Sequence, residues 1–155
     1  MPQRRRDDPP PPAPSGRLQR DEAKIVTLAD AAIGSVNAHG GSFIRRFWDY
    51  APHPIAGGAS CTVKNGPHIA NRVGHVQGGI LLGLAAVTAS AALPATWALT
   101  SVSAYYISPG EGRSLKVKSR IVHHGRLTSV VRTQIMGKGN RRVLEVVTTH
   151  AHRAA

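Results

Sequence analysis

Cysteine, aromatic side chains and long apolar runs are all scarce in this chain of 155 residues. The single cysteine, Cys61, excludes an internal disulfide and is typical of a reducing compartment. The main apolar stretch, residues 80–93, is shorter than the roughly 20 residues that span a bilayer. The first twenty residues are charged and rich in proline, unlike the apolar segment of a signal peptide. We therefore expect a cytoplasmic protein with no membrane partner.

Acidic groups are also few, and this sets the charge of the chain. There are 8 Asp and Glu against 20 Lys and Arg, which gives a formal net charge of +12. A basic body attracts polyanions such as nucleic acid, an anionic membrane or a phosphorylated small molecule, and a solvated basic surface fits the composition equally well. The sequence has no helix-turn-helix, RNA-recognition or zinc-finger motif, so nucleic acid is the least favoured partner.

The distribution of proline divides the chain into an arm and a single domain. Residues 1–20 carry three consecutive arginines and six prolines, and this composition predicts a disordered arm. Residues 21–155 are enough for one domain with a hydrophobic core. We divide that domain into an N-terminal helical segment, 21–54, and a core, 55–152.

Hydrophobic periodicity predicts the elements of both parts. Apolar residues recur at helical spacing over residues 21–37, and a second short apolar face follows at 43–48. Small and aliphatic residues at 80–93 predict a buried helix, which Pro94 ends. The expected strands cover residues 59–64, 96–107, 114–123, 127–136 and 142–150. This order predicts an α+β fold in which an antiparallel sheet packs on one apolar helix. Its exposed edges predict a homodimer or a dimer of dimers.

The start of the apolar helix is the first candidate for a functional site. Gly78 and Gly79 leave backbone N–H groups uncovered where the helix dipole is positive. Such a helix terminus can bind a carbonyl oxygen or an anion.

A set of motifs in chain order resembles the hotdog-fold acyl-CoA thioesterases, and within them the phenylacetate-pathway (PaaI-like) branch. The resemblance covers roughly residues 55–150. The matching positions are Asn71, Gly74, Gly78, Gly79, Tyr106, Ser108, Pro109, Gly112, Leu115, Gly125 and Arg126.

The resemblance implies a hotdog fold, a curved sheet wrapped around the central helix, and hydrolysis of an acyl-CoA thioester. It implies that the Gly78 amide stabilises the oxyanion, that Gly79 lies against the substrate, and that Asn71 helps to hold the attacking water. Arg72 and Arg126 are candidates, by charge alone, for binding the phosphates of coenzyme A. No cofactor other than the CoA ester itself, and no metal, is expected.

Two positions depart from the family pattern. The histidine that usually precedes the glycine pair is replaced by Gln77, and the helix carboxylate that activates water is replaced by Ala86. His75 is then the leading candidate for a base near neutral pH, although a structural role in its loop fits equally well. Ser90 occupies a place where some relatives have a hydroxyl that positions water. Without the carboxylate, a second hypothesis stays open: a non-catalytic hotdog protein that binds an acyl-CoA or a related thioester as a sensor or carrier module.

Three further side chains, His68, Glu111 and Glu145, remain as candidates for the base. His68 lies in the same loop as His75, and Glu111 lies in a turn. Glu145 lies in the last strand, where pairing between strands is the favoured role. Cys61 has no visible activating neighbour, so a buried structural thiol is expected.

Overall fold

The computed structural model describes residues 20–71 and 73–153, so the expected arm and Arg72 lie outside the described residues. Two helices come first: α1 spans Arg20–His39 and α2 spans Phe43–Phe47. Asp21 and Glu22 lie in the first turn of α1, where negative charge favours the helix dipole. Both expected helices are confirmed, with bounds that differ by one or two residues.

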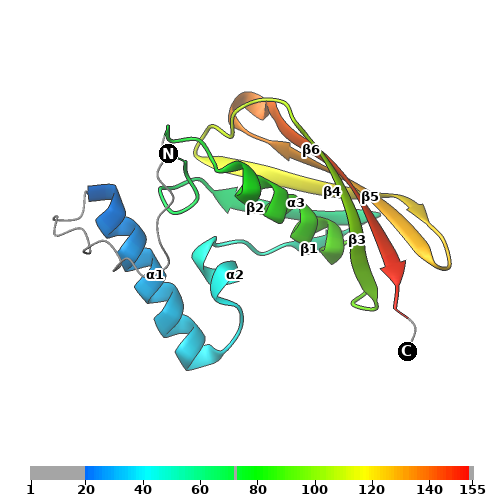
Figure 1. Ribbon diagram of the computed structural model, residues 1–155, viewed down its shortest axis with the longest axis horizontal. Helices are drawn as coiled ribbons and strands as arrows, with labels where there is room; N and C mark the ends of the chain where they lie inside the picture. The colour runs from blue at the N-terminus through cyan, green and yellow to red at the C-terminus, as the bar shows by residue number, and fades with distance from the viewer. Residues whose placement is uncertain (1–19, 72, 154–155) are drawn as a thin grey trace, which may run out of the picture.

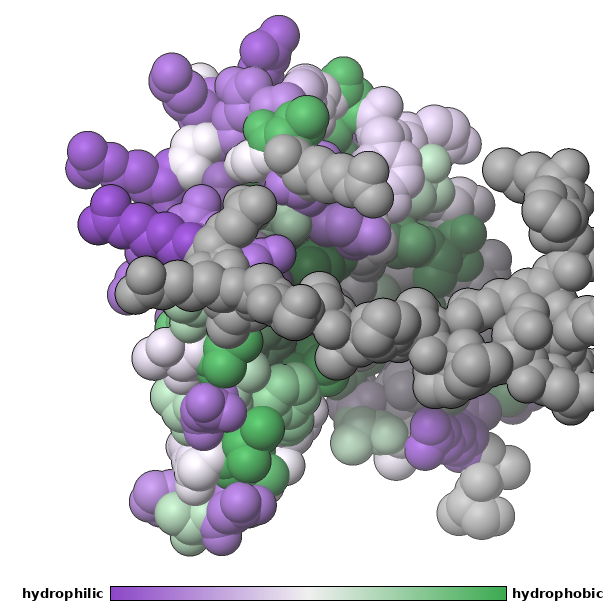
Figure 2. All heavy atoms as spheres, turned by 60° about the vertical axis from the view of Figure 1, so that its left-hand side comes forward, coloured by the Kyte–Doolittle hydropathy of each residue, from purple (hydrophilic) through white to green (hydrophobic). Residues whose placement is uncertain are grey.

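The first helix is only lightly packed. Ala32 is its one buried side chain among the described residues, whereas Val26, Leu28 and Ile33 remain 45%, 42% and 47% exposed. Figure 2 brings this side of the molecule forward and shows hydrophobic and hydrophilic surface interspersed there. The helix α1 therefore flanks the core and contributes little to it.

Six antiparallel strands form one sheet in the order β1-β2-β4-β5-β6-β3. The strands are β1 (His53–Ile55), β2 (Gly58–Lys64), β3 (Trp97–Tyr106), β4 (Ser114–His124), β5 (Thr128–Met136) and β6 (Arg142–His152), with a short 3-10 turn, η1 (Lys138–Asn140), between the last two. The sheet curves around one helix, α3 (Gly78–Ala91), which lies across its concave face (Figure 1). The curved sheet around a central apolar helix, with an extra N-terminal helix, confirms the expected α+β architecture.

One strand was not predicted from the sequence. β1 contains Pro54 and follows Pro52, and these prolines predict the end of the helical segment and not a strand. Proline is tolerated because β1 pairs only with β2 and is an edge strand of the sheet. The strand also begins two residues before the expected start of the core at residue 55.

The core lies between α3 and the concave face of the sheet. Leu81, Leu84 and Ala85 of α3 pack in one cluster with apolar side chains of β2, β4, β5 and β6. The alternation expected for β4 is confirmed, because Leu115, Val117 and Ser119 are buried and the residues between them are exposed. The opposite face of α3 is only half-buried, and there the ring of Trp48 packs closely over Gly83.

A buried histidine in β6 makes the stability of the fold depend on pH. His150 is fully buried; its Nε2 shares a 3.0 Å hydrogen bond with the Thr148 hydroxyl, and its Nδ1 has no partner in the described residues. Burial lowers the pKa of His150 from its ordinary value of 6.5. In the unfolded chain the imidazole therefore binds a proton at a higher pH than in the folded chain.

We predict that the free energy of unfolding falls as the pH drops below about 6.5, because protons then favour the unfolded state. The His150→Leu variant should lose part of this dependence. Urea unfolding at pH 7.5 and pH 5.5 measures the difference for both proteins. An equal fall in the two proteins would show that His150 does not contribute.

Candidate functional site

The side chain of Gln77 caps the N-terminus of α3. Gln77 is the N-cap residue, and its Oε1 accepts a 3.0 Å hydrogen bond from the Ile80 amide. Its backbone carbonyl accepts from the amides of Ile80 and Leu81, both at 3.0 Å. The amides of Gly78 and Gly79 precede these donors, as the first amides of a helix do. Gln77, which stands where the family has a histidine, thus serves as a helix cap.

The loop before α3 is held in shape by Asn71. Its Oδ1 accepts hydrogen bonds from the amides of Val73 and His75, at 3.0 and 3.1 Å. Its own amide donates to the His75 carbonyl at 2.7 Å. Gly74 adopts φ 80, a conformation that glycine adopts without strain. Asn71 therefore fixes the position of His75.

His75 faces a carboxylate from a distant turn. Its Nε2 lies 3.3 Å from Oε1 of Glu111, and both side chains are partly exposed. The turn is anchored to the loop and to the sheet, because the Val76 amide donates to the Gly110 carbonyl at 3.1 Å and the Lys138 amide donates to the Glu111 carbonyl at 2.9 Å. Since Nε2 faces an acceptor, it carries the proton in the neutral ring, and Nδ1 is left as the basic atom.

Tyr106, at the end of β3, completes the surroundings of Gly78. Its hydroxyl donates a 2.8 Å hydrogen bond to the Gly78 carbonyl. A Cβ at Gly78 would lie 3.4 Å from the Tyr106 ring, an ordinary contact distance, so the ring lies directly beside this glycine. Asn71, His75, Gly78 and Tyr106 line one shallow cavity of about 310 Å³. The arrangement places a helix-terminal amide and a carboxylate-paired imidazole at the same cavity.

Two of the residues expected at the site lie elsewhere in the chain. Ser90 is exposed near the end of α3, about 18 Å from Gly78 at about 1.5 Å per residue. Arg126 is exposed in the turn between β4 and β5, at the opposite end of the sheet from Gly78. Ala86 is half-buried on α3. Within one subunit neither Ser90 nor Arg126 lines the cavity at the Gly78 amide.

Sequence reasoning did not identify the partners that organise the site. Tyr106 entered only as part of a strand-end motif, and Glu111 only as an isolated acid in a turn. The Tyr106 hydroxyl and the Gly78 carbonyl belong to residues 28 positions apart. No local signal marks such a pair, because the contact depends on how β3 and α3 pack.

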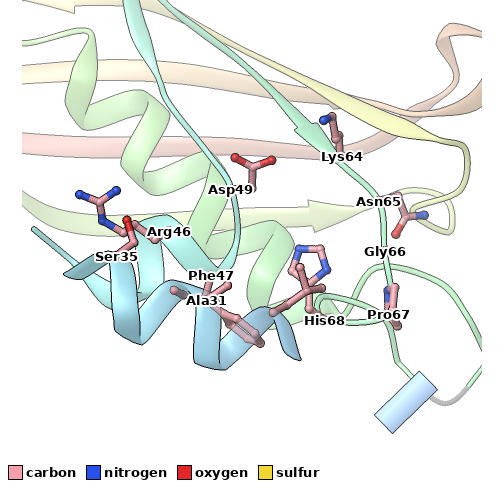
Figure 3. A pocket seen from close by; sticks show the side chains of 12 residues that line it. Ala31, Ser35, Arg46, Phe47, Asp49, Lys64, Asn65, Gly66, Pro67 and His68 are labelled. Atoms are coloured by element: carbon pink, nitrogen blue, oxygen red, sulfur yellow. The ribbon is translucent and has the colours of Figure 1, made fainter. Parts of the chain in front are cut away.

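A second and larger pocket, of about 600 Å³, lies between the helical segment and the end of β2. Figure 3 shows its lining from α1, from the α2 segment and from the loop after β2. His68 belongs to this pocket and not to the cavity at Gly78. Burial lowers the pKa of His68, and the nearby charge of Asp49 partly opposes this effect. His68 is therefore separated from the amide that would hold a thioester.

The remaining candidates have structural surroundings. Glu145 pairs with Arg132 and Arg142 at 3.3 and 3.2 Å, which confirms its expected role between strands. Cys61 is buried, and burial raises the pKa of its thiol. Among residues 20–71 and 73–153, no three His, Cys, Asp or Glu side chains form a group that could hold a metal ion. None of the helices in the described residues is long and apolar enough to cross a bilayer.

Solved structures with the same fold cover most of the chain. The BH2602 protein from Bacillus halodurans, solved with CoA, is 16% identical, covers 89% of this chain and 97% of its own, and has a TM-score of 0.75. A hypothetical thioesterase from Streptococcus pneumoniae, solved with coenzyme A, is 24% identical, covers 68% and 88%, and has a TM-score of 0.61. The conserved protein PA5202 from Pseudomonas aeruginosa is 23% identical, covers 72% and 94%, and has a TM-score of 0.65. These likenesses confirm the hotdog fold.

No curated protein matches the sequence. The family model of the acyl-CoA thioesterase N-terminal domain matches residues 67–153. This range includes the residues that line the cavity at Gly78, the helix α3 and four of the six strands, β3 to β6. Because this match spans more than half of the chain, the protein belongs to the acyl-CoA thioesterase family that this domain defines.

Proposed function

We propose that this protein hydrolyses acyl-CoA thioesters, with the Gly78 amide as the oxyanion donor and His75 as the general base. The observation that carries the proposal is the His75–Glu111 pair, because His75 of this pair lines the same cavity as Gly78. The membership of the chain in the thioesterase family supports the reaction type.

The helix-terminal amide supplies electrostatic stabilisation. When water attacks a thioester, negative charge develops on the carbonyl oxygen, and a fixed N–H donor binds that charge without reorganising. The hydrogen bond from the Tyr106 hydroxyl to the Gly78 carbonyl fixes the peptide that follows Gly78. Glycine at this position also lets the substrate approach the backbone closely.

His75 supplies the proton transfers. In the proposed step, Nδ1 of His75 removes a proton from water while the oxygen of that water forms a bond to the thioester carbon. The tetrahedral intermediate then expels the CoA thiolate, which takes the proton back from His75, and the products are a carboxylic acid and free CoA. Glu111 holds the ring and stabilises the imidazolium that forms between these two steps.

Several finer features of the proposal rest on the sequence pattern. Asn71, Gly78 and Gly79 match the PaaI-like branch, and two of the structures with this fold contain CoA. Because Arg126 lies at the far end of its own sheet, it would reach the phosphates of CoA only from a neighbouring subunit. An unpaired buried thiol at Cys61 is consistent with the cytoplasm.

Removal of the base should abolish most of the activity. We expect His75→Ala to lower kcat by about 10²–10⁴-fold, as loss of a general base does. Glu111→Gln should cause a smaller fall, because it keeps the imidazole and removes only the charge that orients it. The measurement is thiol release from a panel of short, medium and aromatic acyl-CoAs.

The matched control is His53→Ala, which changes an exposed histidine of β1 outside the cavity. This variant should keep the full rate. An undiminished rate in His75→Ala would exclude His75 as the base. Loss of rate in both variants would indicate a general effect on the fold.

A second function, binding without hydrolysis, is favoured by one specific observation. α3 carries no acidic side chain, and the family's carboxylate position is Ala86. Such a protein would retain the pocket and the oxyanion donor but would lack the usual base. Saturable binding of an acyl-CoA without thiol release would support this alternative.

The substitution Ala86→Asp distinguishes the two functions. If the protein binds thioesters without hydrolysing them, a carboxylate at this position should create thiol-release activity. If His75 already acts as the base, the substitution should change the rate little or lower it. Circular dichroism of the variant checks that a carboxylate on the half-buried face of α3 leaves the fold intact.

Self-association of the chain is proposed through β3. This strand is at the edge of the sheet, and its exposed side chains include Leu99, Val102 and Tyr105. An apolar edge strand of 10 residues is a ready template for pairing with a second copy.

Light scattering after size exclusion should therefore give at least twice the chain mass of 16.4 kDa. Val102→Lys should reduce this mass, because a charge on an edge strand opposes strand pairing. A monomer for the unmodified chain, or a dimer unaffected by the substitution, would contradict pairing through β3.

A further inference from the structure

The pocket of about 600 Å³ between α1 and the loop after β2 has no part in the proposed hydrolysis. Side chains of α1, of the α2 segment and of residues 64–68 line it, and none of them lines the cavity at Gly78 (Figure 3). It lies at the end of β2, whereas the proposed pairing through β3 takes place at the opposite edge of the sheet. Its volume is in the range of small-molecule sites. We call it the α1 pocket.

The wall that α1 contributes consists mainly of small residues. Leu28, Ala31, Ala32 and Ser35 recur at the spacing that places side chains on one face of a helix. Alanine and serine are too short to fill the space in front of them, and Leu28 stays 42% exposed although it lines a hollow. The α1 pocket is therefore a space with an apolar wall that the side chains of the described residues leave unfilled.

The opposite wall is aromatic. The ring of His68 stands edge-on to the ring of Phe47, with centroids 5.6 Å apart and an angle of 69° between the planes. Burial lowers the pKa of His68, so the imidazole is uncharged at neutral pH. The two rings therefore present an uncharged flat surface that suits an apolar group.

Three charged side chains also line the α1 pocket. Arg46 and Lys64 are cations and Asp49 is an acid, and none of the three forms an ion pair within residues 20–71 and 73–153. In Figure 3, Arg46 and Lys64 lie on opposite sides of the pocket, with Asp49 between them. Two cations against one carboxylate leave one positive charge, which a monoanion balances. A dianion such as a phosphate would be repelled more strongly by Asp49.

The backbone on either side of α2 holds two of these charges in place. Nη2 of Arg46 donates a 3.0 Å hydrogen bond to the Gly40 carbonyl, in the turn that joins α1 to α2. Asp49 adopts φ 50, a conformation that aspartate tolerates better than most residues, and its amide donates to the Arg46 carbonyl at 3.2 Å. The guanidinium is therefore held beside the pocket, and its remaining N–H groups are available to an anion.

We propose that the α1 pocket binds a small carboxylic acid with an apolar body. The carboxylate lies on the guanidinium of Arg46, whose planar fork matches two carboxylate oxygens. The apolar body lies between the alanine face of α1 and the rings of Phe47 and His68, where its burial displaces water from apolar surface. This binding does not rest on the proposed hydrolysis, because the α1 pocket shares no lining residue with the cavity at Gly78.

Titration calorimetry of the full chain with benzoate, hexanoate and the amides of both acids tests the proposal. We expect saturable binding of at least one acid, about tenfold or more tighter than binding of its uncharged amide. Arg46→Gln should weaken binding of the acid about tenfold or more, because a charge-assisted contact is lost. Ala31→Trp, which fills the pocket from an exposed position of α1, should abolish binding.

Two matched controls accompany these variants. Arg45→Gln removes a cation from the neighbouring position of α2, and Ala23→Trp adds the same indole to α1, and neither position lines the pocket. Both controls should bind the acid within about twofold of the unmodified chain. An equal loss in Arg45→Gln and Arg46→Gln would replace the proposed site with diffuse attraction to basic surface.

The variant His75→Ala separates the α1 pocket from the cavity at Gly78, since a carboxylic acid could bind at either. The affinity for the acid should be the same in this variant as in the unmodified chain. Loss of binding in His75→Ala, or unchanged binding in Ala31→Trp, would place the acid elsewhere and overturn the proposal. The absence of saturable binding for both acids would overturn it as well.

Discussion

The burial of one face of α3 against the curved sheet is the constraint on which the rest of the molecule depends. Leu81 and Leu84 are almost fully buried there, and each such side chain contributes about 1.5–3 kcal/mol relative to exposure. The buried Thr88 hydroxyl on this interface is satisfied, because it donates to the Leu84 carbonyl at 2.7 Å. The helix therefore has one defined position on the sheet, and its N-terminus has one defined position beside Tyr106 and the Asn71 loop.

That position explains how the cavity can offer the proposed oxyanion donor while lacking a helix carboxylate. The proposed donor is a backbone amide, so it depends on the cap and the glycine pair and not on any side chain of α3. The proposed acid–base pair lies instead at the rim, where His75 and Glu111 remain partly exposed to water. A charge at the rim avoids the desolvation that a carboxylate against an apolar helix would suffer.

One face of the sheet is apolar and the other is basic, because side chains alternate along each strand. A strand alternates between faces, so the apolar residues that cover α3 and the cations that face away from it occupy neighbouring positions on β4. The concave face then holds the core and the cavity at its end. The face turned away from α3 concentrates positive charge, and Glu145 is the acid that partly balances it through Arg132 and Arg142.

The sequence by itself determined the local elements and singled out Gly78 as the proposed oxyanion donor. The helical spacing of apolar residues predicted α1, and the run of small aliphatic residues that ends at Pro94 predicted α3. Alternation located β4, because these patterns are set by neighbours within a few residues. β1 was missed because Pro54 normally argues against a strand, and only an edge position removes that objection.

The tertiary structure alone decided which distant side chains meet. Strand order, register and the packing of α3 on the sheet bring together three pairs of residues: His75 with Glu111, Tyr106 with Gly78, and Arg120 with Arg132. None of these is encoded in a local pattern. A shift of one residue in register would turn each strand side chain to the other face, so these pairings exist only once the whole sheet has formed.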